Sequence, residues 1–363
     1  MAAGTLTTTQ PTKEPYELIS RKSTLAMFAC GLLAVVAAGC GSSSSGSSGD
    51  SSTITGAGST LVLPLVSKWE SDYNEKAGVA VTYGGIGSGS GIDQITARSV
   101  DFGASDAPLT PDQVEAGDGL LQIPWALSAT GITYNVSGVS DNLKLDGPTV
   151  ADIYLGNITS WDDPAIAKLN PGVKLPSTKI TPVYRSDGSG DTYALTDYLS
   201  KISPDWKSQV GVSTLVKFPT GVGAEHNDGV AAALTKTDGT IGYLAASYIQ
   251  SNDLSQAALE NAAGNFETPD VKTIAAAAAT VKTVPSDNAI SITDPPASAK
   301  DAYPLSTFTY VLVPQDSSKA DALKKFITYA IGPGQEFGPD LLFAPLPKVV
   351  LTANTATIAK IGS

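Results

Sequence analysis

The chain has 363 residues, of which 42% are hydrophobic and 16% charged, and its formal net charge is −12. This length is enough for two lobes with their own cores, and the acidic balance argues against nucleic acid and anionic membranes as general partners. The two cysteines, Cys30 and Cys40, both lie near the N-terminus, and His226 is the single histidine. The composition therefore argues against disulfides, a zinc site or a Ser-His-Asp hydrolase in the folded body.

Residues 1–39 have the order of a secretory signal peptide, with a basic pair, a short apolar run and small residues at its end. Arg21 and Lys22 precede the run, which is shorter than the roughly 20 apolar residues of a membrane span. Its end, Ala-Ala-Gly-Cys, resembles a bacterial lipobox, so Cys40 is predicted to carry lipid. Residues 40–52 are rich in Gly and Ser and are predicted to form a flexible tether. The sequence thus predicts a lipoprotein on the extracytoplasmic face of the cell membrane.

Three times along the chain, a predicted strand runs through a turn rich in Gly, Ser and Thr into a predicted helix. Such a turn favours anions, because backbone N–H groups are exposed there and the helix dipole is positive at that end. The turns span residues 56–60, 84–91 and 185–192. The third has Arg185 at its mouth, and the strand after the second ends on Asp106. Together these features predict a convergent oxyanion site.

The rest of the body alternates between strands and helices. A helix at 61–73 and short strands at 79–83 and 102–106 come first. They are followed by a β-leaning stretch at 121–134, two short helices within 151–169 capped at Ser160 or Asp162, strands at 179–184, 241–243 and 307–313, and helices at 274–281, 320–331 and within 346–361. This alternation indicates an α/β architecture.

Motifs for nucleotide binding and hydrolysis are missing from the sequence. It contains no G-x-x-x-x-G-K-[ST], and no true G-x-G-x-x-G follows a predicted strand. Ser88, Ser90 and Ser189 lack the G-x-S-x-G frame of a nucleophile elbow. His226 is interpreted as a surface residue near the start of a helix.

Six segments resemble the phosphate-binding protein of the bacterial phosphate-specific ABC transporter. In order, they are TGAGST, YGGIGSGSG, VDFGASDAPL, DIYLGNITSWDDPAIAKLNPG, RSDGSG and NDGVAAAL. The resemblance implies an α/β, two-lobed periplasmic-binding-protein fold of type II (a Venus flytrap) with two crossing hinge strands. One lobe would contain residues 53–127 and 307–363, and the other residues 128–306.

The same resemblance implies which residues bind phosphate. Thr60 and the backbone of Leu61 match the first turn, where many relatives have Phe instead of Leu. The other implied ligands are Ser88 of the second turn, the acid Asp106, and Arg185, Ser189, Gly190 and Asp191 of the third turn. Asp191 falls where some members have Thr, so its carboxylate either points away or acts as a second acceptor for a phosphate proton.

The chemistry of these side chains agrees with that assignment. Hydroxyls, helix-turn amides and an Arg can hold a dianion without a basic surface, and Asp187 is the natural neighbour to orient Arg185. The Asp106 carboxylate accepts a hydrogen bond from protonated phosphate but repels sulfate, which carries no proton at neutral pH. Selectivity is therefore expected to come from an acceptor that only phosphate satisfies.

The predicted function is high-affinity binding of inorganic phosphate and its delivery to ABC-transporter permease subunits and, through them, to the ATPase. The protein is expected to be no enzyme, to need neither cofactor nor metal, and to contact the membrane through its lipid anchor. One alternative is a binding protein for another tetrahedral oxyanion such as sulfate. The other is a phosphomonoesterase that uses Ser88 or Ser189.

Overall fold

The computed structural model describes residues 53–139 and 142–363. The predicted signal peptide, Cys40 and the tether lie outside the described residues. Within the described ranges, no helix combines the length and the apolar character needed to cross a membrane.

The described chain alternates between helices and strands, as predicted. The strands are β1 (Ile54–Gly58), β2 (Val81–Gly85), β3 (Phe102–Ser105), β4 (Leu120–Asn135), β5 (Lys144–Leu145), β6 (Thr181–Arg185), β7 (Val222–Ala224), β8 (Thr240–Ala245), β9 (Ser255–Gln256), β10 (Ala258–Glu260), β11 (Phe266–Glu267) and β12 (Ser306–Pro314). The α-helices are α1 (Leu63–Ala77), α2 (Ser88–Thr96), α3 (Pro111–Gly117), α4 (Gly147–Leu155), α5 (Pro164–Leu169), α6 (Gly190–Ile202), α7 (Pro204–Gln209), α8 (His226–Lys236), α9 (Ala246–Ser251), α10 (Val271–Ala278), α11 (Ala320–Ile331) and α12 (Lys348–Ile358), with short 3₁₀ turns at Pro333–Phe337 and Pro339–Leu341.

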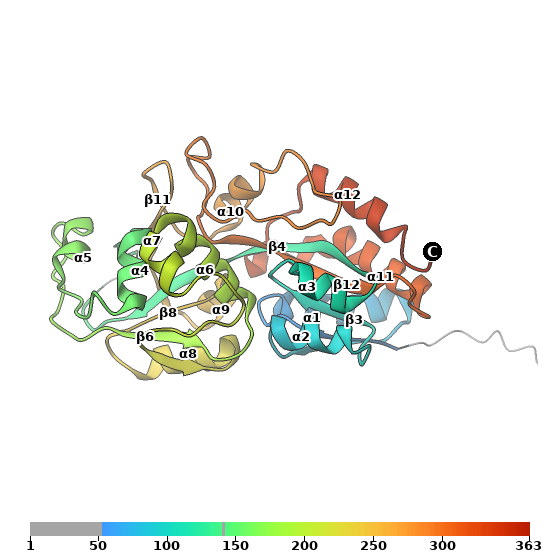
Figure 1. The fold of residues 1–363 in the computed structure, drawn as a ribbon, viewed down its shortest axis with the longest axis horizontal. Coiled ribbons are helices and arrows are strands. Elements are labelled where there is room, and N and C mark those ends of the chain that lie inside the picture. Colours follow the sequence, from blue (N-terminus) through green and yellow to red (C-terminus); the bar gives the residue numbers. More distant parts are fainter. Residues whose placement is uncertain (1–52, 140–141) are drawn as a thin grey trace, which may run out of the picture. The chain divides into compact units, whose positions relative to one another are not determined.

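A nine-stranded sheet in the order β2-β1-β3-β12-β4-β8-β6-β7, with β9 also paired to β4, organises the fold. The long strand β4 changes partner part-way along. From Leu120 to Ala129 it runs antiparallel to β12, and from Thr130 to Asn135 it runs antiparallel to β8. Figure 1 shows β4 passing from the α1–α3 and α11 side to the α4–α8 side.

The chain crosses between the two groups of strands a second time just before β12. There the N–H of Thr130 donates to the carbonyl of Leu305 over 3.0 Å. Two adjacent crossings in one sheet make a two-lobed α/β fold, so the predicted fold class is confirmed. The numbered boundaries of the lobes stay a prediction.

Each group of strands has its own aromatic cluster. Phe102 of β3 packs against Tyr83, Trp125 and Phe326, with ring centroids 5.8–5.9 Å apart. On the other side, Phe218 lies against Tyr154, Tyr184, Trp206 and Tyr243, at 4.6–6.1 Å. Aromatic pairs of this kind add stability beyond the burial of their surfaces. Each group of strands, whose ends carry the polar residues, is therefore held by a packed core of its own.

One predicted helix cap is wrong. Helix α5 is capped by Asp163, whose Oδ1 accepts the N–H of Ala165 over 2.9 Å. Of the two predicted caps, the Ser160 hydroxyl donates to Asp162 instead. Because Pro164 has no N–H and suits the first helical position, the cap falls on the residue immediately before it.

Candidate anion-binding site

The structure brings the three Gly/Ser/Thr turns together. Helix α2 begins at Ser88 and helix α6 at Gly190. The Gly190 N–H donates to Ser88 Oγ over 3.1 Å, and Arg185 Nη1 donates to Thr60 Oγ1 over 3.3 Å. Residues more than 100 positions apart in the sequence thus meet at one buried point.

Asp106 follows β3 directly and is 1% exposed. Its carboxylate accepts hydrogen bonds from Ser59 Oγ at 2.6 and 2.8 Å and from Thr309 Oγ1 at 2.6 Å. Ser88 Oγ lies 3.3 Å from Oδ2 of the same carboxylate, and the Asp106 N–H donates to Ser88 Oγ over 3.2 Å. Strand β3, α2 and β12 therefore fix the orientation of this acid.

Burial dominates the acidity of Asp106. Loss of water and, after it, the nearby Asp191 charge raise the pKa of its carboxyl, the hydroxyl donors and Arg185 lower it, and the net result is a pKa of about 7. A carboxyl with a pKa near neutrality can both accept and donate a proton in the physiological range. It is therefore suited to interact with a ligand that also carries protons.

Arg185 ends β6 and is 1% exposed. Its Nε donates to Asp187 Oδ1 over 2.7 Å and its Nη2 to Asp187 Oδ2 over 2.5 Å, so the expected orienting role of Asp187 is confirmed. Burial opposes its charge, but the hydrogen bond to Asp187 and the charge of Asp191 raise the pKa of Arg185 overall. A bidentate pair of this type fixes the plane of the guanidinium and leaves Nη1 to face the site.

Asp191 is buried within the site and does not point away from it. Its Oδ1 accepts from Thr130 Oγ1 at 2.7 Å, and its Oδ2 accepts from Asn227 Nδ2 at 2.9 Å and from Arg185 Nη1 at 3.2 Å. Burial raises the pKa of Asp191, and the charge of Arg185 opposes this. Of the two placements left open by the sequence, the inward one is observed.

The remaining predicted residues, Leu61 and Ser189, lie in the first and third turns of the site. The Leu61 N–H donates to Ser59 Oγ over 3.0 Å. Ser189 is the N-cap of α6, and its Oγ accepts the N–H of Thr192. The structure therefore gathers all the predicted ligand residues around Asp106 and Arg185, and their binding of phosphate stays a prediction.

Four polar residues of the site were not predicted: Ser59, Thr130, Asn227 and Thr309. Asn227 Nδ2 reaches both Thr60 Oγ1, at 2.8 Å, and Asp191 Oδ2, and its Oδ1 accepts the N–H of Ala245 at 2.9 Å. Thr130 and Thr309 lie in strands that contain other hydroxyl residues, such as Ser128 in β4 and Thr307 in β12, so no local signal marks them. Ser59 lies in the first predicted turn itself, next to Thr60.

His226 is the first residue of α8, as the sequence predicted, and its side chain is about one-third exposed. Its backbone N–H donates to Asp187 Oδ1 over 3.0 Å, and its Nε2 lies 3.8 Å from Asp187 Oδ2. The residue thus contacts the acid that orients Arg185 and does not enter the anion site itself. Within residues 53–139 and 142–363, no cluster of His, Cys, Asp and Glu is arranged to hold a metal ion.

Glycines allow the second and third turns to touch. The Gly89 N–H donates to the Gly188 carbonyl over 2.9 Å, and a Cβ on Gly188 would lie 2.9 Å from the Gly89 Cα. A Cβ on Gly190 would lie 2.3 Å from both Cβ and Oδ2 of Asp106. No side chain fits at these positions without moving the turns apart.

We therefore expect Gly190→Ala to weaken anion binding by at least about tenfold, because a shift of even 1 Å between Asp106 and α6 misplaces several donors at once. Gly229→Ala is the matched control, since its added Cβ would meet atoms only at 3.7 Å or beyond and lies in helix α8. Calorimetric titration of both variants measures the difference. Equal affinities for the two variants would show that the close contact between Gly190 and Asp106 is not needed.

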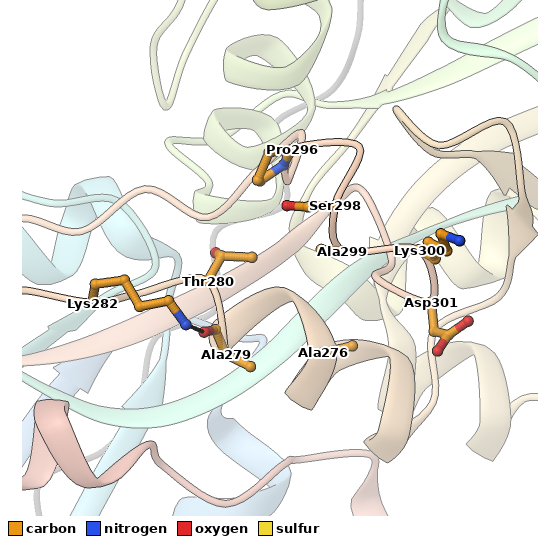
Figure 2. A pocket seen from close by; sticks show the side chains of 9 residues that line it. All are labelled: Ala276, Ala279, Thr280, Lys282, Pro296, Ser298, Ala299, Lys300 and Asp301. Carbon is orange, nitrogen blue, oxygen red and sulfur yellow. Dashed lines mark hydrogen bonds between the residues drawn. The ribbon is translucent and has the colours of Figure 1, made fainter.

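A separate surface hollow lies away from this site. Its wall comes from the end of α10 and the segments that follow it (Figure 2), with Ala276, Thr280, Lys282 and Pro296 among the lining residues. Lys282 Nζ donates to the carbonyl of Ala279 at its edge over 2.9 Å. None of the predicted ligand residues lines this hollow.

A buried polar site where two groups of strands meet is the arrangement of a solute-binding protein, and comparison with known proteins agrees. A family model described as a PBP superfamily domain matches residues 43–333. Among solved structures, a high-affinity periplasmic phosphate-binding protein bound with phosphate aligns with a TM-score of 0.68 at 21% identity, covering 86% of this chain and 99% of that one. A phosphate-binding protein from Stenotrophomonas maltophilia aligns with a TM-score of 0.68 at 19% identity over the same shares of the two chains. At these identities, the two structures establish the fold.

Similarity in sequence is higher to other relatives. The phosphate-binding protein PstS of Xylella fastidiosa strain Temecula1 is 40% identical over 299 residues, which cover 81% of each chain. PstS of Pasteurella multocida is 39% identical over 303 residues, covering 82% of this chain and 88% of the relative. The chain therefore belongs to the PBP superfamily and, within it, to the PstS family of phosphate-binding proteins. The family resemblance drawn from the motifs is confirmed, and so is the expectation of a binding protein and not an enzyme.

Proposed function

We propose that this protein binds inorganic phosphate outside the cell membrane and passes it to the permease of an ABC transporter, through which the ATPase drives import. The observation that carries the proposal is the presence of both Asp106 and Arg185, each 1% exposed, in one site. The guanidinium supplies the counter-charge for an oxyanion. The carboxyl selects an oxyanion that carries a proton.

Hydrogen-bond donors, and not a basic surface, supply the rest of the binding energy. The Thr60 hydroxyl lies beside Arg185 Nη1, and the Gly190 N–H lies beside the Ser88 hydroxyl. Each hydrogen bond to a charged group contributes about 1.5–3 kcal/mol. A few such bonds together with the guanidinium support tight binding even though the protein as a whole is acidic.

The two alternatives make different demands on the same site. A sulfate-binding protein would place a buried carboxyl against an anion with no proton to offer, which costs affinity. A phosphomonoesterase would need a base beside Ser88 or Ser189. Ser88 Oγ donates to the Asp106 carboxylate over 3.3 Å, so Ser88 has a carboxylate that could act as its base, whereas Ser189 Oγ serves as a helix cap and accepts from the N–H of Thr192. An ester-hydrolysis assay therefore decides this alternative.

Equilibrium dialysis with radiolabelled phosphate tests the proposal against both alternatives. We expect saturable retention of phosphate by the purified protein, no displacement by excess sulfate, and no release of product from a chromogenic phosphate ester. Displacement by sulfate at equal concentration would support the first alternative, and ester hydrolysis would support the second.

The proposed location follows from the N-terminal sequence. A basic pair, a short apolar run and Ala-Ala-Gly-Cys before a Gly/Ser tether support lipid attachment at Cys40. One acyl chain gives only marginal membrane binding, so a stable anchor requires more than one chain or a second contact. Docking on the permease would be that second contact during transport.

Cys40→Ser is expected to release the protein from the membrane fraction, because Ser offers no thiol for acylation. Fractionation followed by mass spectrometry of the N-terminus measures the effect. Blocked processing could leave the variant held by its N-terminus, so the processed mass is read alongside the fraction. A wild-type protein that is soluble and carries no lipid would contradict the assignment.

A further inference from the structure

Asp191 adds a second buried carboxyl to a site that has one guanidinium. Asp106 and Asp191 are each 1% exposed. Among the residues that the structure describes, Arg185 is the one basic side chain in ion-pair contact with Asp191. A bound phosphate would therefore enter a site that already contains more acid than base.

The hydrogen bonds of Arg185 make this imbalance more severe. Nε and Nη2 are both occupied by Asp187, so one edge of the guanidinium is already paired with a carboxylate. The remaining nitrogen, Nη1, is shared by Thr60 and Asp191. Nη1 carries two N–H groups and already donates to Thr60 and Asp191, so an incoming anion has to share this nitrogen with the Asp191 carboxylate. A buried charge without a partner costs on the order of several kcal/mol of stability. A buried carboxylate in that position therefore takes up a proton and becomes neutral.

Other titratable groups near the pair do not relieve the imbalance. Burial raises the pKa of the tyrosines that face it, so they stay neutral and offer no charge. The single histidine contacts Asp187 and not Asp191. The groups facing the two carboxyls are Tyr83 from β2, Arg185 from β6, Asp187 from the turn after β6, Tyr243 from β8 and Tyr248 from α9, with His226 of α8 behind Asp187.

We propose that Asp191 is a specificity-determining residue that couples phosphate binding to proton uptake. When phosphate binds above neutral pH, one proton comes from the solvent with each anion and is held between the Asp191 carboxyl and the bound phosphate. The proton leaves a buffer acid, whose conjugate base keeps the bonding electron pair, and forms one O–H bond on the carboxyl or the phosphate, so the complex gains one positive charge relative to its separate parts. This inference rests on the proposed function and adds the ionic form in which the ligand is held.

The surroundings of Asp191 hold its carboxyl in place for this role. Thr130 fixes Oδ1, and Asn227 fixes Oδ2 while also reaching Thr60 of the first turn. Both neighbours are neutral, so they orient the carboxyl without supplying the charge that would keep it ionised. Burial raises the pKa of both the Asp106 and the Asp191 carboxyl, which favours proton uptake at this pair.

Calorimetric titration of the purified protein with inorganic phosphate, in buffers of different ionisation enthalpy, counts the protons directly. At about pH 8.5, we expect the wild type to take up close to one proton per phosphate, and Asp191→Asn to take up close to none. Correspondingly, the affinity of the wild type should fall by up to about tenfold per pH unit above neutrality, and that of Asp191→Asn should fall much less.

Two further variants keep the test decisive. Asp93→Asn, which removes an exposed charge from α2, should take up protons like the wild type. Asp191→Thr supplies a hydroxyl in place of the acid and should bind phosphate without proton uptake. The same proton count in the wild type and in either Asp191 variant would overturn the inference. Loss of binding in both Asp191 variants with intact thermal unfolding would also overturn it, because Asp191 would then be needed to hold Arg185. Failure of the wild type to bind phosphate would overturn the proposed function and this inference with it.

Discussion

Arg185→Ala is expected to weaken phosphate binding on the order of a thousandfold, because the variant leaves a buried anion without its counter-charge, a penalty of roughly 3–5 kcal/mol. The substitution also strips Asp187 and Asp191 of their shared partner. Calorimetric titration measures the affinity, and thermal unfolding separates a loss of binding from a loss of fold.

Arg185→Lys and Lys76→Ala complete this experiment. Lys keeps a positive charge but cannot pair bidentately with Asp187, so its affinity should fall between those of the wild type and the Ala variant. Lys76 has a half-exposed side chain that pairs with Asp72, and its loss should leave binding unchanged. A decrease of less than about tenfold for Arg185→Ala would place Arg185 outside the site.

Asp106→Asn is expected to change selectivity more than affinity for phosphate. The variant keeps the shape, removes the charge and supplies an NH₂ donor. Phosphate should bind only modestly more weakly, since a charge-assisted bond of about 1.5–3 kcal/mol is exchanged for a neutral bond of about 1 kcal/mol. Sulfate, no longer repelled, should begin to compete. Paired calorimetric titrations with both anions at neutral pH show the change.

The pH dependence of the wild type provides an independent check on Asp106. Burial raises the pKa of its carboxyl to about 7, so the carboxyl becomes protonated and neutral as the pH falls below that value. Sulfate should therefore compete better with phosphate at acidic pH in the wild type and show little such change in Asp106→Asn. Asp112→Asn, an exposed acid in the first turn of α3, should behave like the wild type. An Asp106→Asn variant that still ignores sulfate would shift the selectivity role to Asp191.

Local sequence patterns were enough to predict the elements that position the site. Helix α11 was predicted at its observed bounds, because Ala320 to Ile331 is an amphipathic stretch stopped by Gly-Pro. Strand β12 could be predicted because a mostly apolar run of this length is typical of a buried strand. Its observed bounds extend the prediction by one residue at each end. The three turns could also be found locally, because a run of Gly, Ser and Thr directly before a helix is visible in the sequence itself.

Contacts between distant parts of the chain left no such local pattern. Thr309 reaches Asp106 across 203 positions, and Asn227 reaches Thr60 across 167. A single hydroxyl in a strand or a single amide at a helix start gives no sign of its partner. The inward orientation of Asp191 depended on the same missing information, because Thr130 and Asn227 set it from other strands and helices.

Side-by-side calorimetric titration of the purified protein with phosphate and with sulfate at neutral pH tests the central claim most directly. We predict saturable binding of one phosphate per chain, no heat of binding from sulfate, and an unchanged phosphate isotherm in excess sulfate. Equal binding of the two anions, or sulfate binding without phosphate binding, would contradict the account.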